Sequence, residues 1–414
     1  MVIIATASAD EEKLEGHRKS PRENGLHDAV EEEEDDDEEE EVGEVVLGFA
    51  EKPDKPWSLL PQYFPSKAGG TPAWLNPVDL PSGKSQLCDW CEEPLQFLLQ
   101  VYAPIAEGGS ESTFHRTLFV FVCVSMTCLL RDQHEQWKRR PERPSRSVKV
   151  FRSQLPRVNP FYSSDPPKED GTTTASGSGV PLCSWCGTWR GEKVCSGCKS
   201  ARYCCQKHQG MHWRTSHKVK CIVPGLLPPD SRLVTHNTTT ASVERVKAAS
   251  NTLWPEFELE QAAENEFEVV SDDESHSNSL VSTHNRVDDS MSSVIDSFQA
   301  DDEKKCWASF QERMARAPEQ VLRYCRMDGA KPLWPILSGR PSKADIPNCS
   351  YCGGLLKFEC QIMPQLLYYF RVKADVDSID WATIALYTCE ASCDAGVAYA
   401  EEFAWVQLYP RSAN

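Results

Sequence analysis

Eight metal-ligand side chains occur between Cys183 and Cys221, and they constrain the fold more than any hydrophobic run does. They come as four pairs, namely Cys183 and Cys186, Cys195 and Cys198, Cys204 and His208, and His217 and Cys221. Each CxxC pair can hold one side of a zinc ion, and the CxxxH and HxxxC pairs place two ligands one helical turn apart. Eight ligands predict two closed tetrahedral zinc sites, although spacing alone leaves open which pairs share a metal.

The zinc predicted here is structural. A segment this short cannot form a self-sufficient core, and each site can contribute roughly 10 kcal/mol to folding. All ligand positions are filled by the protein, so none remains for a catalytic water. Two neighbours need separate treatment. Cys205 follows Cys204 directly and is expected to be a spare thiol, while His212 is an alternative ligand one turn after His208.

Charge divides the 414 residues into contrasting parts. The net charge is −18 and the pI about 5.1, with an unbroken acidic run at residues 31–41. Low hydrophobicity and block charge predict disorder for residues 1–44, either as a solubilising tail or as a mimic of nucleic-acid backbone that attracts a basic client. The metal-ligand segment is instead basic, with eight cations against Glu192: Arg190, Lys193, Lys199, Arg202, Lys207, Arg214, Lys218 and Lys220.

Cysteine usage indicates a reducing compartment. The chain has 18 cysteines, yet its first residues lack the basic segment of a signal peptide. The longest apolar run, residues 118–130, is too short to span a bilayer. We therefore expect a cytoplasmic protein with no membrane segment, and a nuclear location as the alternative, with CxxC pairs used for metal.

Two further cysteine sets lie on either side of this segment. Cys88, Leu95 and Gln100 fall on Cys349, Leu356 and Gln361 at one constant offset. The pattern predicts an internal duplication, with one four-cysteine zinc site in each β-rich half. The alternative is buried free thiols, because cysteine packs well in cores. The predicted ligands are Cys88, Cys91, Cys123 and Cys128 in the first half, and Cys349, Cys352, Cys389 and Cys393 in the second.

The predicted fold class is β-rich α+β, divided by composition into six segments. They are a disordered acidic tail (1–44), a β-rich half (45–165), a linker (166–181), the zinc finger (182–222), a mostly disordered linker (223–302) and a C-terminal domain (303–412). Within the second linker, the aromatic–acidic stretch 253–261 is expected to dock on a folded half. Residues 306–326 have helical spacing, and the Arg-rich segment 138–157 ends in a predicted strand at 147–157.

The central segment resembles the MYND-type zinc finger, whose CxxC, CxxC, Tyr-Cys, Trp and HxxxC pattern it meets throughout. The surrounding chain is similar to the programmed cell death protein 2 family in 46–222 and 303–410. The matching stretches include LGFAEKPDKPWSLLPQYFPSKAGGTPAWLNP, LQFLLQVYAPI, FHRTLFVFVC, RSVKVFRSQLPR, PNCSYCGG, MPQLLYYF, DSIDWATIALYTCEASC and EEFAWVQLYP. The resemblance implies interleaved ligands, with Cys183, Cys186, Cys204 and His208 on one zinc and Cys195, Cys198, His217 and Cys221 on the other.

The same resemblance implies a non-enzymatic chaperone that binds a newly made small-subunit ribosomal protein and supports ribosome biogenesis. An acidic holder suits such a basic client. The alternative is an adaptor of corepressor type that regulates cell death or proliferation, in which the finger binds proline-rich motifs through Trp189, Tyr203 and Trp213. No enzyme motif is present, so we expect no catalysis. The overall acidity argues against direct nucleic-acid binding.

Overall fold

The computed structural model describes residues 45–105, 110–137, 145–221, 248–267, 291–375 and 377–409, with the backbone alone for 134–135, 137 and 291–301. The acidic tail 1–44 lies outside the described residues, as do the last residue of the predicted finger, 222, and 223–247 and 268–290 of the expected linker. In the first half the elements are β1 (Val46–Glu51), β2 (Lys67–Ala68), β3 (Gln96–Tyr102), β4 (His115–Val122), α1 (Met126–Trp137) and β5 (Val148–Leu155).

The finger, the expected linker and the second half contribute the remaining helices and strands. They are β6 (Lys193–Val194), β7 (Arg202–Tyr203), α2 (Gln206–His212), the π-helical turn η4 (Trp213–His217), α3 (Lys218–Lys220), β8 (Phe257–Ala263), α4 (Met291–Arg316), β9 (Gln320–Tyr324), β10 (Leu356–Ile362), α5 (Gln365–Tyr369), β11 (Thr383–Cys389) and β12 (Ala400–Gln407). Short 3-10 turns occur at η1 (Pro61–Tyr63), η2 (Gly83–Gln86), η3 (Glu111–Thr113), η6 (Glu264–Phe267) and η7 (Lys343–Asp345).

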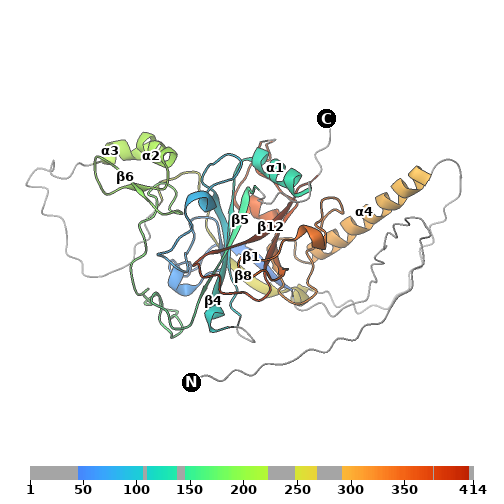
Figure 1. Ribbon diagram of the computed structural model, residues 1–414, viewed down its shortest axis with the longest axis horizontal. Helices are drawn as coiled ribbons and strands as arrows, with labels where there is room; N and C mark the ends of the chain where they lie inside the picture. Colours follow the sequence, from blue (N-terminus) through green and yellow to red (C-terminus); the bar gives the residue numbers. More distant parts are fainter. Residues whose placement is uncertain are drawn as a thin grey trace, which may run out of the picture. The chain divides into compact units, whose positions relative to one another are not determined.

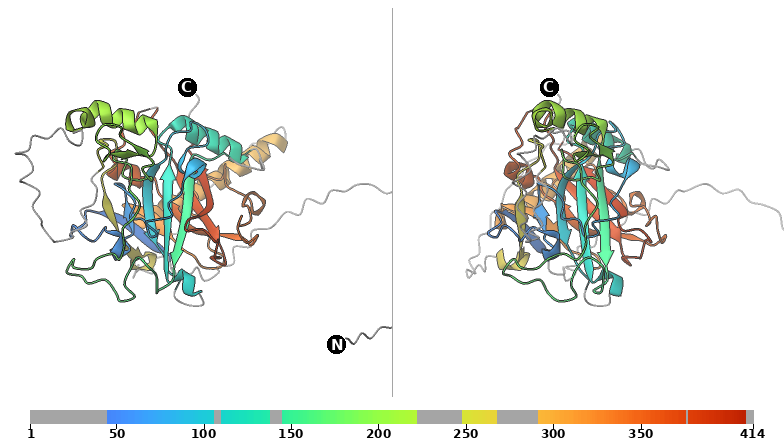
Figure 2. Two further views of the ribbon diagram at one scale, coloured as in Figure 1. Left: turned by 60° about the vertical axis from the view of Figure 1, so that its left-hand side comes forward. Right: turned by 90° about the vertical axis from the view of Figure 1, so that its left-hand side faces the viewer.

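Within the described residues, strands of both halves form one closed antiparallel barrel (Figures 1 and 2). The order is β1-β8-β2-β3-β4-β5-β12-β11-β10-β9, and β9 pairs with β1 to close it. The halves meet twice, because β5 of the first half pairs with β12 and β1 pairs with β9. The two expected halves therefore share one sheet, and closure leaves no long unpaired edge between them.

Both faces of the central strands are buried, which explains their nearly continuous apolar sequences. On β4, Leu118 and Val120 belong to the core inside the barrel, whereas Phe119 and Phe121 belong to a second core on its outer face. Alternation along a strand sends successive side chains to opposite faces. The outer core also contains side chains of the finger, so the finger covers a surface that the barrel alone would expose to water.

The finger is attached to the first half through tryptophans. Trp189 is fully buried, donates from Nε1 to the carbonyl of Leu95 at 2.9 Å and lies 4.5 Å from Phe121 between ring centroids. In return Trp74 of the first half donates to the carbonyl of Thr188 at 2.9 Å. Buried indole N–H groups need such acceptors, and these two bonds fix the finger on the barrel.

Part of the expected linker is a barrel strand. Residues 248–267 run from the finger, where Ala249 donates to the carbonyl of Ser184, to β8, which lies between β1 and β2. Trp254 stacks on Phe370 of the second half at 4.7 Å. Gly69 accommodates the close approach, since a Cβ there would lie 1.9 Å from the carbonyl oxygen of Pro255. The stretch 253–261 thus docks on the first half by strand pairing and on the second half by ring stacking.

The helical expectation for 306–326 is correct only in its first part. Helix α4 ends at Arg316, and Val321 and Tyr324 belong to strand β9. Pro318 cannot continue a helix, and pairing with β1 and β10 then determines the strand. The predicted strand in 147–157 is present as β5. Among the described residues, no helix combines the length and apolar composition needed to cross a lipid bilayer.

Candidate metal centres

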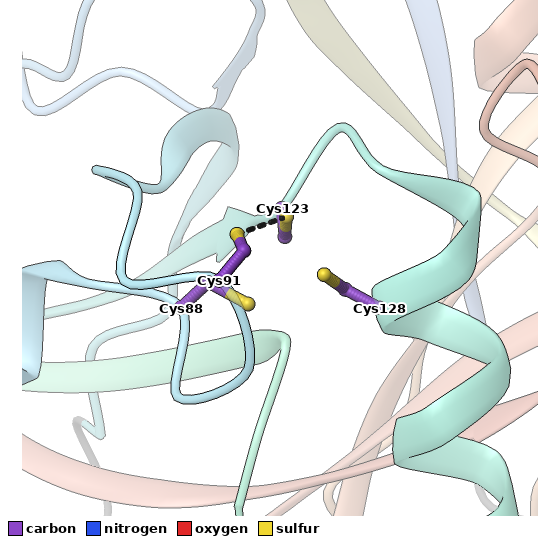
Figure 3. A group of neighbouring side chains, drawn as sticks. All are labelled: Cys88, Cys91, Cys123 and Cys128. Atoms are coloured by element: carbon purple, nitrogen blue, oxygen red, sulfur yellow. Dashed lines mark hydrogen bonds between the residues drawn. The ribbon is translucent and has the colours of Figure 1, made fainter.

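The first-half cysteines converge from three elements (Figure 3). Cys88 and Cys91 lie in the turn between η2 and β3, Cys123 directly follows β4, and Cys128 lies in the first turn of α1. The Sγ atoms of Cys91 and Cys123 are 3.6 Å apart. The turn is closed by hydrogen bonds from Cys88 N to the carbonyl of Glu93 and from Glu92 N to the carbonyl of Cys88. Local turn geometry and one strand pairing therefore bring all four thiols together.

The second half repeats this arrangement. Cys349 and Cys352 lie in the turn before β10, Cys389 ends β11 and Cys393 follows it. The Sγ–Sγ distances are 3.7 Å for Cys349–Cys393 and 3.6 Å for Cys352–Cys389. Strand register repeats as well: Phe97↔Phe121 and Gln100↔Phe119 in β3–β4 match Phe358↔Tyr387 and Gln361↔Ala385 in β10–β11. Each ladder has its irregularity at the same place, between Phe97 and Leu99 and between Phe358 and Cys360.

In the finger, the ligand side chains gather in the interleaved sets that the resemblance implied. One set is Cys183, Cys186, Cys204 and His208, and the other is Cys195, Cys198, His217 and Cys221. His208 Nδ1 lies 3.1 Å from Cys204 Sγ and 3.7 Å from Cys183 Sγ. Interleaving follows from β7, α2 and η4, which carry the later ligands back across the two CxxC turns.

The four groups have the dimensions of tetrahedral zinc sites. In every group the ligand atoms lie within 4.8 Å of one another. A tetrahedron with Zn–S bonds of about 2.3 Å has edges of about 3.8 Å, close to the sulfur separations just given and far longer than a disulfide bond. The interaction between Cys88 and Cys123 lowers the pKa of Cys88 to about 5 and raises the pKa of Cys123, so zinc binding would release a proton from Cys123. The residues fit zinc, which would supply a structural cross-link in each group.

The additional finger residues lie outside the metal groups. Cys205 caps α2, with its Sγ accepting from His208 N at 3.4 Å, as expected of a spare thiol. His212 Nδ1 lies 3.1 Å from the hydroxyl of Tyr203, so it is engaged elsewhere. The expected aromatic surface is mostly wrong: Trp189 and Tyr203 are fully buried, and Trp213 alone of the three is exposed, at 42%. The buried pair serves the shared core of finger and barrel.

Zinc analysis of the purified protein tests these centres. We expect four zinc ions per chain, because four groups each offer four ligands. Substituting both Cys349 and Cys352 with serine should lower the value to three, while the matched variant Cys205→Ser should retain four. Fewer than three ions in the unsubstituted protein would contradict zinc sites in both halves.

Buried ion pairs between the halves are features that sequence reasoning missed. Arg116 on β4 and Glu359 on β10 are both fully buried, and Arg116 Nη1 lies 2.5 Å from Glu359 Oε1. Burial alone would raise the pKa of Glu359, but the charge and hydrogen bonds of Arg116 lower it to about 2. A second pair joins Arg152 on β5 to Glu402 on β12 at 2.5 Å. The sequence feature that could have indicated these ion pairs was a charged residue inside an otherwise apolar strand.

Comparison with known proteins assigns the same three regions. The family model described as programmed cell death protein 2, N-terminal domain, matches residues 44–169; the C-terminal putative domain of that protein matches 304–408; and the MYND finger matches 183–221. The chain is 37% identical to programmed cell death protein 2 of Bos taurus over 88% of this chain and 96% of that protein. The relative from Mus musculus matches with the same identity and coverage.

More distant relatives share part of this similarity. A programmed cell death protein 2-like protein of Homo sapiens is 27% identical, covering 79% of this chain and 85% of its own length. No solved structure matches the chain.

Proposed function

Because the chain belongs to the programmed cell death protein 2 family, we propose that it is a non-enzymatic, zinc-stabilised chaperone of a newly made, basic small-subunit ribosomal protein. It would hold this client until ribosome assembly, in the cytoplasm and also in the nucleus. Two arguments support a binding role. Each metal group has four protein ligands, which leaves zinc no position for a substrate or water. The finger is of a type associated with protein interaction.

One surface supports a basic client in particular. We call it the acidic–aromatic patch: Glu51, Glu258, Glu319, Tyr368 and Tyr369. Glu51 and Glu258 are direct cross-strand partners, an arrangement of like charges that a bound cation would relieve. Besides burial, the charges of Glu319 and Glu51 raise the pKa of Tyr369, so these carboxylates lie near its ring. Tyr368 is 82% exposed. An exposed tyrosine beside carboxylates suits arginine and lysine side chains.

Affinity purification with mass spectrometry tests the client and the surface together. We expect the unsubstituted protein to enrich one small-subunit ribosomal protein. The Glu51→Lys/Glu319→Lys variant should recover at least tenfold less of it, because two attractive charges become repulsive. The control Asp165→Lys/Glu169→Lys makes the same change in net charge on an exposed loop and should retain the client.

Two results would contradict this proposal. If no ribosomal protein is enriched above the level recovered with a charge-matched acidic bait, the proposed client is refuted. Equal loss in both double variants would mean that general acidity, and not the patch, attracts it.

A second candidate function is an adaptor that binds proline-rich motifs through the finger. A hollow of about 290 Å³ is lined by Gln206, Gln209, Gly210 and Trp213, together with the ligands Cys195 and His217. The exposed indole of Trp213 provides a flat apolar surface on which a proline could stack. Trp213→Ala separates the candidates in the same purification. It should remove proline-rich partners and leave the ribosomal client in place.

We also infer that the two halves arose by internal duplication, as the repeated cysteine turns, register and bulge position support. The six expected segments remain our proposal for the domain organisation. The structure changes this division in one respect: the halves 45–165 and 303–412 share one barrel with β8 of the linker.

A further inference from the structure

The second-half metal group depends on a turn that carries two of its four ligands. Cys389 ends β11 and Cys393 follows four residues later. Between them Ser392 is buried and has a φ of +42°, in the left-handed region that side chains other than glycine rarely adopt. Such a conformation persists only where surrounding contacts enforce it. The position of both thiols therefore depends on what holds this turn.

Three arginines hold it. We call Arg116, Arg152 and Arg326 the arginine cluster. Arg116 Nε donates to Ser392 Oγ at 3.1 Å, and Arg326 Nη2 donates to the carbonyls of Cys389 and Glu390 at 3.0 and 2.7 Å. Arg152 Nη1 donates to the carbonyl of Cys393 at 3.0 Å, and its Nη2 lies 3.8 Å from the Sγ of the same residue. The arginine cluster therefore contacts both the backbone of the turn and the sulfur of Cys393.

Two members of the cluster come from the other half of the chain. Arg116 is on β4 and Arg152 on β5, whereas the thiols that they approach belong to the second half. Glu402 completes the contact: its Oε1 pairs with Arg152 Nε at 2.5 Å, and its Oε2 accepts from Cys389 N at 3.0 Å. Arg152 is almost fully buried. Its fork-shaped guanidinium thus joins Glu402 and Cys393 in a fixed geometry.

The first-half group is supported differently. Cys123 N donates to the carbonyl of Ser147, and Ser147 donates from N and Oγ to Asp132. Asp89, between Cys88 and Cys91, accepts from Arg146 N and from Lys149 Nζ. All of these residues belong to the first half. The two metal groups are alike in their ligands but differ in where their supporting contacts originate.

We propose that Arg152 is a positioning residue for the zinc site formed by Cys349, Cys352, Cys389 and Cys393, so that this site is completed only when strands of the first half pair with the second. The first-half group forms from its own half. Zinc in the second-half group thereby secures barrel closure at the β5–β12 seam. A site with four thiolates carries a net charge of −2, which nearby guanidinium groups also stabilise. This inference does not depend on the identity of the client.

The test uses the zinc-loaded, full-length protein and measures how fast each cysteine is alkylated by iodoacetamide in the presence of a chelator, by peptide mapping. In Arg152→Gln we expect the four second-half cysteines to react about 10–100-fold faster, the usual scale for losing a contact to a metal ligand. Cys88, Cys91, Cys123 and Cys128 should keep their original rate. Lys149→Gln is the matched control, because it removes a buried cation from the same strand. It should leave the second-half rate unchanged.

A further variant separates positioning from the cost of an unpaired buried charge. Arg152→Gln/Glu402→Gln removes both charges, and the glutamine at 402 can still accept from Cys389 N. The second-half cysteines of this double variant should still be alkylated as fast as in Arg152→Gln. The proposal is overturned if this double variant reacts at the original rate, if Arg152→Gln leaves the second-half rate unchanged, if it accelerates both halves equally, or if Lys149→Gln accelerates the second half as strongly.

Discussion

Cys183→Ser is expected to unfold the finger and to destabilise the barrel with it. Loss of one zinc removes on the order of 10 kcal/mol, comparable to the whole stability of an ordinary domain. The finger cannot unfold alone, because buried Trp189 packs on Phe121 and bonds to Leu95, while Trp74 bonds to Thr188. Denaturant unfolding followed by tryptophan fluorescence and by circular dichroism should show both signals move to markedly lower denaturant concentration.

The neighbouring thiol provides a matched control for this substitution. Cys205 is not a predicted ligand, and its Sγ caps α2. Serine is a preferred residue at that position of a helix, so Cys205→Ser should change stability by no more than about 1 kcal/mol. An unchanged barrel transition in Cys183→Ser would show instead that the finger is an independent module.

Arg116→Met is expected to cost about 3–5 kcal/mol of folding free energy, since it leaves the carboxylate of Glu359 buried without its bidentate partner. Arg326, with Nε 3.5 Å from Glu359 Oε2, and the hydroxyl of Tyr324, at 3.0 Å, would remain, but neither replaces the two hydrogen bonds that Arg116 donates. Adding Glu359→Gln should recover most of the loss, because the buried charge is then gone. Chemical denaturation at pH 7.5 measures all three proteins. Equal stability of Arg116→Met and the unsubstituted protein would contradict this account.

The destabilisation caused by Arg116→Met should depend on pH. In the unsubstituted protein, Arg116 lowers the pKa of Glu359 to about 2 from the ordinary 4.5, so this group's stabilisation is complete above pH 4.5 and is lost as the pH falls towards 2. Without Arg116, the largest influence that lowers the pKa of Glu359 is lost, and burial, which raises it, is opposed only by weaker influences such as Arg326 and Thr388. The pKa of Glu359 therefore rises, and the loss of stability in Arg116→Met should be smaller at pH 5.5 than at pH 8, because protonation removes the buried charge. Working above pH 5.5 keeps the cysteines bound to zinc.

The metal groups could be predicted from the sequence because the spacing of their ligand residues is a local feature. CxxC turns, one-turn CxxxH and HxxxC spacings, and the offset that relates Cys88 to Cys349 are visible without knowing any long-range contact. The structure gathers the same sixteen side chains in four groups. Local spacing also indicated β5 and the first part of α4, whereas Pro318 and the pairing of β9 overrode the helical pattern further along.

The remaining features depend on pairing between distant segments. Nothing in the alternation of β5 specifies β12 as its neighbour, and the stretch FELEQAA shows no sign that it separates β1 from β2. Burial of Trp189, the Arg116–Glu359 pair and the approach of Arg152 to Cys393 follow from that topology. Ligand spacing alone identifies the side chains that can bind zinc, since it is a property of neighbouring residues. Closure of the halves into one barrel follows from long-range contacts, because strand partners are selected by the joint burial of surfaces far apart in the chain.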